Sequence, residues 1–128
     1  MTALLELGAL TERVIGSAIE VHRRLGPGFV EAIYENALCI EMPKHGIALE
    51  RQVRVPVWYE QVRVGIHRLD RLVEGQLIVE LKAVQAIEDA HLMIARSYAR
   101  ALGKRHALVL NFGRPRLEIR RAICPADP

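Results

Sequence analysis

The fold is decided by the stretch RLDRLVEGQLIVELKAV, residues 68–84, in which two apolar runs flank a Glu74-Gly75 turn signal. Side chains alternate between the two faces of a strand, so Glu80 and Lys82 share one face and the apolar residues interleaved with them point the other way. Charged side chains are rarely buried without a partner, and Asp70, Glu80 and Lys82 therefore need one. The stretch predicts a hairpin that carries a divalent-metal site.

The length of the turn determines whether the two carboxylates share a face. If Glu74-Gly75-Gln76 is a three-residue loop, Asp70 lies across from Glu80 and Leu72 lies across from Ile78. A two-residue loop would separate the carboxylates, because a slip of one residue reverses every side chain. The metal-site hypothesis therefore predicts a longer or bulged turn.

Two neighbouring carboxylates can hold Mg²⁺ or Mn²⁺, which prefer oxygen ligands and keep several waters for a substrate phosphate. Such an ion activates a water and polarises a phosphoryl oxygen, while Lys82 would orient the water or stabilise developing negative charge. The pattern indicates phosphodiester hydrolysis. The alternative from the residues alone is a surface salt bridge between Lys82 and either Asp70 or Glu80.

Apolar periodicity with Gly and Pro punctuation predicts the order ααβββαββ, an α/β (α+β) fold with a mixed central sheet flanked by helices. Thr11 is the expected N-cap of the first helix, Pro43 is expected to end or kink the second, and Pro56 predicts an edge strand. The expected helices cover residues 11–25, about 29–43 and about 87–102, and the expected strand segments cover 53–59, 62–64, 68–73, 77–84, 106–112 and 116–123.

The composition predicts one domain over residues 1–128, since a chain with 51% hydrophobic residues can fill a single core without disulfides. No apolar run approaches the roughly 18 residues that span a bilayer. The N-terminal stretch carries Glu6 where a secretory signal has a basic start. We therefore expect a cytoplasmic protein without membrane contact.

The charge distribution is compatible with a nucleic-acid partner. The formal net charge is only +3, yet residues 96–121 hold eight Lys and Arg residues against the single acid Glu118. A basic C-terminal third could follow a phosphate backbone, and the alternative is a solvated arginine-rich surface.

Four separated motifs resemble a known family. They are GFVEAIY at 28–34, which fits a GxxExxY pattern and follows VHRRLGP at 21–27, then Asp70, Glu80-Leu81-Lys82, and LNFG at 110–113. In this order, over roughly residues 11–123, they resemble the GxxExxY protein family, which is assigned to the PD-(D/E)XK nuclease superfamily.

The resemblance implies a restriction-endonuclease-like core around one or two Mg²⁺ ions. Glu31 would be the acid from an early helix, Asp70 and Glu80 would ligate the metal, and Lys82 would be the catalytic lysine. The implied activity is Mg²⁺-dependent (or Mn²⁺-dependent) hydrolysis of phosphodiester bonds in DNA, with RNA less favoured.

Three further residues are candidates for contact with the substrate or the ligating carboxylates. Tyr34 lies one turn after Glu31 and could hydrogen-bond its carboxylate. His22 fits the family pattern, and Tyr98 lies on the expected third helix. Burial or packing in the core is the alternative for each of them.

Three positions depart from the resemblance, and one of them is Pro43, which interrupts a helix that relatives continue. Ile94 stands where relatives carry a Gln that could contact the site, and Arg71 stands where an apolar residue is expected beside Asp70. Ile94 and the basic C-terminal third support an alternative function, a catalytically weakened domain that binds nucleic acid or a protein. A homodimer through the edge strand near Pro56 or the helix around Tyr98 is also left open.

Overall fold

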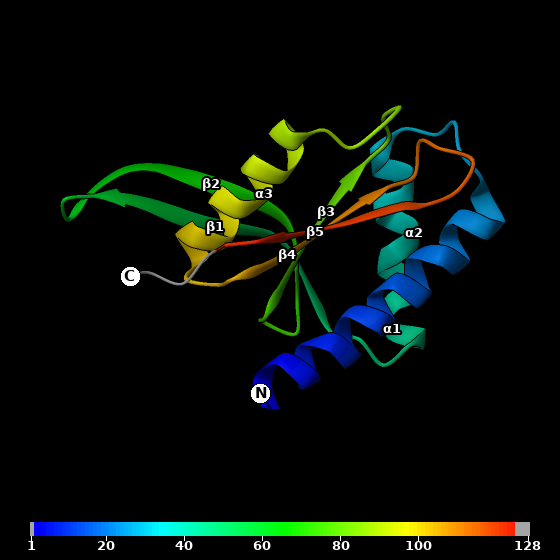
Figure 1. The fold of residues 1–128 in the computed structure, drawn as a ribbon, viewed down its shortest axis with the longest axis horizontal. Coiled ribbons are helices and arrows are strands. Elements are labelled where there is room, and N and C mark those ends of the chain that lie inside the picture. Colours follow the sequence, from blue (N-terminus) through cyan, green and yellow to red (C-terminus); the bar gives the residue numbers. More distant parts are fainter. Residues whose placement is uncertain (1, 125–128) are drawn as a thin grey trace.

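A computed structural model of the chain describes residues 2–124, and the side chains of residues 2–6 and of Asp70 lie outside the description. Within this range, helices pack on a single five-stranded sheet (Figure 1). None of the described helices is long and apolar enough to cross a membrane. The elements are α1 (Thr2–Leu25), α2 (Glu31–Lys44), β1 (Leu49–Tyr59), β2 (Val62–Val73), β3 (Leu77–Lys82), α3 (Asp89–Leu102), β4 (His106–Asn111) and β5 (Glu118–Ile123). The predicted order ααβββαββ and the α+β class are confirmed.

The strands lie in the order β1-β2-β3-β4-β5, so β1 is an edge strand, as Pro56 predicted. The β3–β4 pair is parallel and the three other pairs are antiparallel, which makes the sheet mixed. Parallel neighbours need a crossover connection, and α3 supplies it between β3 and β4. The predicted mixed sheet is therefore confirmed.

The sheet has a hydrophobic core on each face. One core contains buried residues of α1 and α2, including Val14, Tyr34 and Leu38, together with Val79 and Leu81 of β3. The other core contains the buried face of α3 and residues from the remaining side of the sheet, including Ile78, Leu92, Ala95 and Val109. Strand β3 contributes to both cores, so its charged residues Glu80 and Lys82 lie in the interior layer of the molecule.

Several sequence-based boundaries were wrong, among them those of α1 and β2. Thr11 does not cap a helix, because α1 begins at Thr2 and the Thr11 hydroxyl donates to the Leu7 carbonyl oxygen at 2.8 Å. A threonine can satisfy its hydroxyl in this way inside a helix. Residues 62–64 and 68–73 form one continuous strand, β2, since Gly65 pairs with Val57 and does not turn the chain.

The predicted turn between β2 and β3 is confirmed. The Gln76 amide donates to the Val73 carbonyl oxygen at 2.9 Å, and Glu74 and Gly75 have φ values of 52° and 64°. Leu72 lies opposite Ile78, as the three-residue loop requires. The two strands separate beyond this pair: β1 and β2 extend together to one side while β3 runs toward α2 (Figure 1).

Strand β2 reverses its facing at Asp70. Leu69 packs in the core under α3, and Val73 packs in the core under α1 and α2. These residues are four positions apart and would point to the same face in a regular strand. Gln52, which lies opposite this point in β1, has a φ of 54°, a conformation that is unfavourable by about 1–2 kcal/mol for a residue with a Cβ. The reversal turns Arg71 toward α2.

The LNFG motif fixes the chain that follows β3. The Asn111 side chain accepts from the Val84 and Gly113 amides at 3.0 Å and donates to the Val84 carbonyl oxygen at 3.0 Å. A Cβ on Gly113 would lie 2.5 Å from that carbonyl oxygen. These bonds replace strand pairing at Val84, so β3 ends at Lys82 and not at the predicted Val84.

We predict that Asn111→Ala lowers the free energy of unfolding by about 2 kcal/mol or more, because it leaves buried backbone groups of Val84 without partners. Urea unfolding followed by circular dichroism measures this loss. Asn36→Ala is the matched control, since Asn36 is exposed on α2. Equal unfolding midpoints for the two variants would contradict the structural role of Asn111.

Candidate functional site

The charged residues of β3 lie at the carboxyl end of the strand. Glu80 is 6% exposed and Lys82 is half-buried. In the parallel pair with β4, Glu80 lies opposite Val109 and Lys82 lies opposite Asn111. A carboxylate this deeply buried must be stabilised by opposite charge or by a bound cation.

A buried arginine supplies opposite charge at this place. Arg71 of β2 is fully buried, and its Nη2 lies 2.8 Å from Oε1 of Glu35 on α2. Burial lowers the pKa of Arg71 to about 10, while the negative charge of Glu80 acts in the opposite direction. The guanidinium therefore lies within the field of two carboxylates, one from α2 and one from β3.

The Arg71 guanidinium is held by charge and not by hydrogen-bond geometry. None of its three nitrogens donates a well-directed hydrogen bond to any residue that the structure describes, although Nη2 is within ion-pair distance of Glu35. Buried arginines usually have their donors satisfied. Arg71 is thus a buried positive charge that pairs with Glu35 without a well-directed hydrogen bond to the described residues.

Glu35 is the helical acid that reaches the hairpin. Its side chain is 17% exposed and also lies 3.4 Å from Nη2 of Arg51 on β1. Glu31, the helical acid that the resemblance implied, is exposed in the first turn of α2, and it makes no ion pair or hydrogen bond with the described residues. Sequence reasoning missed Glu35, although the unexpected Arg71 signalled that a second acid had to lie nearby.

Asp70 can be placed by its backbone alone. Its side chain lies outside the described residues, so its predicted convergence with Glu80 stays a prediction. The β2–β3 pairing that sets Leu72 opposite Ile78 ends at that pair, two residues short of Asp70 and Glu80. Among the side chains that the structure describes, no three of His, Cys, Asp or Glu gather around one point, and a metal set that includes Asp70 remains untested.

Tyr34 and His22 connect the helices to neighbouring segments. The Tyr34 hydroxyl donates to the Gly26 carbonyl oxygen at 2.6 Å and accepts from the Phe29 amide at 3.2 Å, and its ring stacks on Phe112. His22 Nε2 lies 2.8 Å from the Arg114 carbonyl oxygen, to which it can donate. Both side chains are buried, and these contacts hold the Gly-Pro-Gly turn and the β4–β5 connection.

The polar residues of α3 are engaged elsewhere. The Tyr98 ring meets His67 of β2 edge to face, with ring centres 4.6 Å apart. His91 Nδ1 accepts from the Glu88 amide at 2.9 Å and so caps the helix. Ile94 is 48% exposed and adds no polar group at the position where the resemblance implied a Gln.

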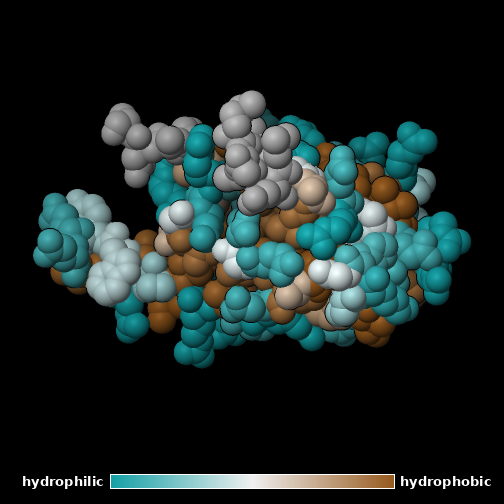
Figure 2. All heavy atoms as spheres, turned by 90° about the horizontal axis from the view of Figure 1, so that it is seen from below, coloured by the Kyte–Doolittle hydropathy of each residue, from teal (hydrophilic) through white to brown (hydrophobic). Residues whose placement is uncertain are grey.

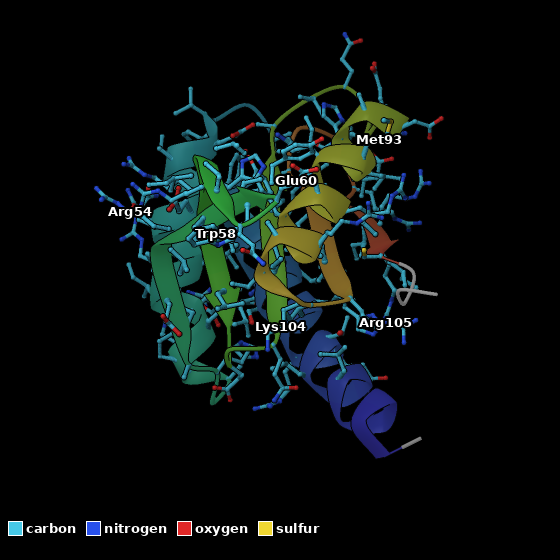
Figure 3. The ribbon with its side chains drawn as sticks, turned by 90° about the vertical axis from the view of Figure 1, so that its left-hand side faces the viewer. Arg54, Trp58, Glu60, Met93, Lys104 and Arg105 are labelled. Atoms are coloured by element: carbon cyan, nitrogen blue, oxygen red, sulfur yellow. The ribbon has the colours of Figure 1, made fainter. Side chains whose placement is uncertain are left out.

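A groove runs between the β1–β2 hairpin and α3. Its volume is about 620 Å³, no acidic residue lines it, and its lining includes Trp58, His67, Met93, Arg96 and Arg100. Trp58 is 60% exposed and Met93 is 62% exposed. Figure 3 looks onto this side, with Trp58 on the hairpin and Met93 on α3, and Figure 2 shows the hairpin projecting from the body of the molecule. The groove combines aromatic and cationic groups, which suits a nucleic-acid strand.

We predict that Glu35→Gln lowers the free energy of unfolding by about 3 kcal/mol, because removing one partner of a buried ion pair leaves an uncompensated charge on Arg71. Glu31→Gln, the matched control one turn earlier on α2, should change it by less than about 0.5 kcal/mol because Glu31 is exposed. Chemical denaturation of the two variants and the wild type measures the difference. If Glu31→Gln lowered the free energy of unfolding more than Glu35→Gln, Glu31 and not Glu35 would be the acid that pairs with Arg71.

Comparison with known proteins identifies the family of the chain. The family model for the PD-(D/E)XK nuclease superfamily matches residues 8–122, a range that contains every strand of the sheet except the last residue of β5. No curated protein and no solved structure matches the chain. With a match over most of its length, the chain belongs to the PD-(D/E)XK nuclease superfamily.

Proposed function

We propose that this chain is a Mg²⁺- or Mn²⁺-dependent nuclease of the GxxExxY group that hydrolyses phosphodiester bonds in DNA, with RNA less favoured. The observation that carries the proposal is the buried Glu80 carboxylate at the end of β3, two residues before Lys82, in a chain of a nuclease superfamily. Burying a carboxylate in this way is unfavourable unless a cation accompanies it.

The donor chemistry fits a hard divalent cation. The Glu35 carboxylate lies at ion-pair distance from the buried Arg71, the charge of Glu80 acts on the same guanidinium, and Asp70 is the predicted third acid. Carboxylate oxygens are the protein ligands that Mg²⁺ and Mn²⁺ prefer. We propose Asp70, Glu80 and Glu35 as the residues that would hold the ion.

The helical acid of the proposed site is Glu35. Its contact with Arg71 brings it to the hairpin, whereas Glu31 is exposed on the first turn of the same helix. The acid implied by the resemblance, Glu31, remains a candidate for contact with substrate from outside the buried cluster. The stabilities of the variants Glu35→Gln and Glu31→Gln distinguish the acid that pairs with Arg71 from the exposed acid.

A bound divalent cation would supply Lewis-acid stabilisation of the phosphate and a water of lowered pKa. The residues of the chain have distinct tasks around it. Lys82 would orient the attacking water and offset the negative charge that develops on the phosphate. Glu80 would fix the position of Lys82 through their shared strand face. The two hydrophobic cores on either side of β3 hold this strand in place.

The groove between the hairpin and α3 is the proposed path of the substrate strand. Trp58 offers an aromatic face for base stacking, and Arg96 and Arg100 line the same groove. Arginine side chains in such a groove attract the phosphate backbone. A second copy of the chain covering the groove is the competing arrangement, and a measured dimer would favour it.

Arg71 also favours a second candidate function. A buried cation beside two carboxylates already provides part of the charge that a metal would supply. Together with Ile94, it supports a weakened domain that binds nucleic acid or a protein partner without cutting. Cleavage measured beside binding distinguishes this candidate from an active nuclease.

We predict that the wild-type protein nicks supercoiled DNA with Mg²⁺ or Mn²⁺, and that EDTA abolishes the reaction. Lys82→Ala should slow cleavage by about 100-fold or more, because it removes a charge that stabilises the transition state. Gel analysis of supercoiled, linear and single-stranded DNA, with matched RNA, measures the rates and the preferred substrate. Lys44→Ala is the control, since Lys44 is exposed at the end of α2. Identical products from wild type and Lys82→Ala would rule out the proposed reaction.

We predict that Trp58→Ala weakens binding of a single-stranded oligonucleotide by about 1–3 kcal/mol, the usual contribution of one stacked base. Tyr59→Ala is the matched control, because Tyr59 is the neighbouring exposed aromatic residue and is not among those that line the groove. Fluorescence anisotropy at several salt concentrations measures both affinities. Equal losses in the two variants would place the nucleic acid elsewhere.

A further inference from the structure

We propose that Arg71 is an internal counter-ion of the acidic site, and that a divalent cation must displace it from Glu35 in order to bind. The inference rests on the proposed function, since it takes Glu35 and Glu80 as members of the metal site. It concerns how tightly the site holds its ion. The wild-type site would therefore fill only at a higher metal concentration than a site with an apolar residue at position 71.

The distances make the two cations competitors for one oxygen. Nη2 of Arg71 lies 2.8 Å from Oε1 of Glu35. A carboxylate oxygen that binds Mg²⁺ lies about 2.1 Å from the ion, which leaves no room for a guanidinium at ion-pair distance on the same side of that oxygen. Because Arg71 is fully buried, its side chain cannot simply rotate out into water when a metal binds. Metal binding thus needs a rearrangement of Arg71.

The charges that face Arg71 explain why it stays there without metal. Glu35 lies against it from α2 and Glu80 acts on it from β3, while Arg51 on β1 is a second positive group at the Glu35 carboxylate. Two carboxylates in a buried site repel one another unless a cation lies between them. Arg71 fills that role until a divalent ion takes it over.

The hydrogen-bond geometry separates a replaceable counter-ion from a structural salt bridge. A structural buried arginine is usually locked by several directed hydrogen bonds. Arg71 directs none of its three nitrogens at an acceptor within the described part of the chain. Its hold on Glu35 is electrostatic, and a doubly charged ion can replace such a contact.

The test is Mn²⁺ affinity, measured by electron paramagnetic resonance of free Mn²⁺ with the full chain. Arg71→Met should bind Mn²⁺ about tenfold more tightly or better, because it removes a positive charge from the site. Arg51→Met is the matched control: it removes an arginine from the same carboxylate, but its side chain is 46% exposed, and the affinity should change less than twofold. Mg²⁺ should compete with Mn²⁺ in every variant.

A second variant keeps the test decisive if Arg71→Met fails to fold without metal. Arg71→Lys retains the charge and should bind Mn²⁺ as weakly as the wild type, whereas Arg71→Gln should bind it more tightly. Thermal unfolding with and without Mn²⁺ provides an independent measure, and the stabilisation by Mn²⁺ should be larger in Arg71→Gln than in Arg71→Lys.

The outcomes separate this inference from the proposed function. Equal Mn²⁺ affinity in wild type, Arg71→Met and Arg71→Gln overturns the counter-ion role, even if the wild type cleaves DNA. If no variant binds Mn²⁺ at millimolar concentration, both the inference and the metal site are overturned. Tighter binding in Arg71→Met and Arg71→Gln supports the inference whether or not the wild type proves to cut.

Discussion

The ion pair between Arg71 and Glu35 links the strand hairpin to helix α2, and the rest of the site depends on it. A guanidinium that is fully shielded from water must be compensated by negative charge. Here that charge comes from Glu35, at 2.8 Å, and from Glu80 on the neighbouring strand. The backbone makes the contact possible by reversing the facing of β2 at Asp70, opposite the positive φ of Gln52. Strain of this kind often collects at functional sites.

The order of elements and the hairpin register could be predicted because both follow from local rules. Once Gly75 is recognised as the turn, the alternation of apolar and polar residues and the positions of Gly and Pro determine which strands pair. Boundaries were less accurate. Thr11 looks like a cap in isolation, yet Leu7 and Leu10 continue the apolar face of α1 toward the N-terminus. Gly65 looks like a break, but its pairing with Val57 keeps β2 continuous.

The site was harder to predict than the fold, because contacts between distant segments decide it. Glu80 and Lys82 follow from the strand pattern, whereas choosing Glu35 over Glu31 requires knowing which side of α2 faces β2. The same limit applied to Tyr34 and His22. Their burial against Phe112 and the β4–β5 connection, residues far along the chain, gives them packing roles that no local pattern reveals. The role of Asp70 as a metal ligand stays a prediction.

The hairpin of β1 and β2 combines two features in one element. Its inner part carries Arg71 to Glu35, and its outer part carries Trp58 to the groove beside α3. Because β1 and β2 would contact both the substrate and the metal site, a movement of these two strands would affect substrate binding and metal binding together. The central claim is that a divalent ion binds between this hairpin and α2.

Anomalous diffraction from crystals soaked in Mn²⁺ tests that claim most directly. The account predicts one strong peak within about 2.2 Å of carboxylate oxygens of Asp70, Glu80 and Glu35, with Arg71 withdrawn from Glu35. The claim would be contradicted by crystals that show no peak at the hairpin, or a peak elsewhere, while Arg71 remains paired with Glu35.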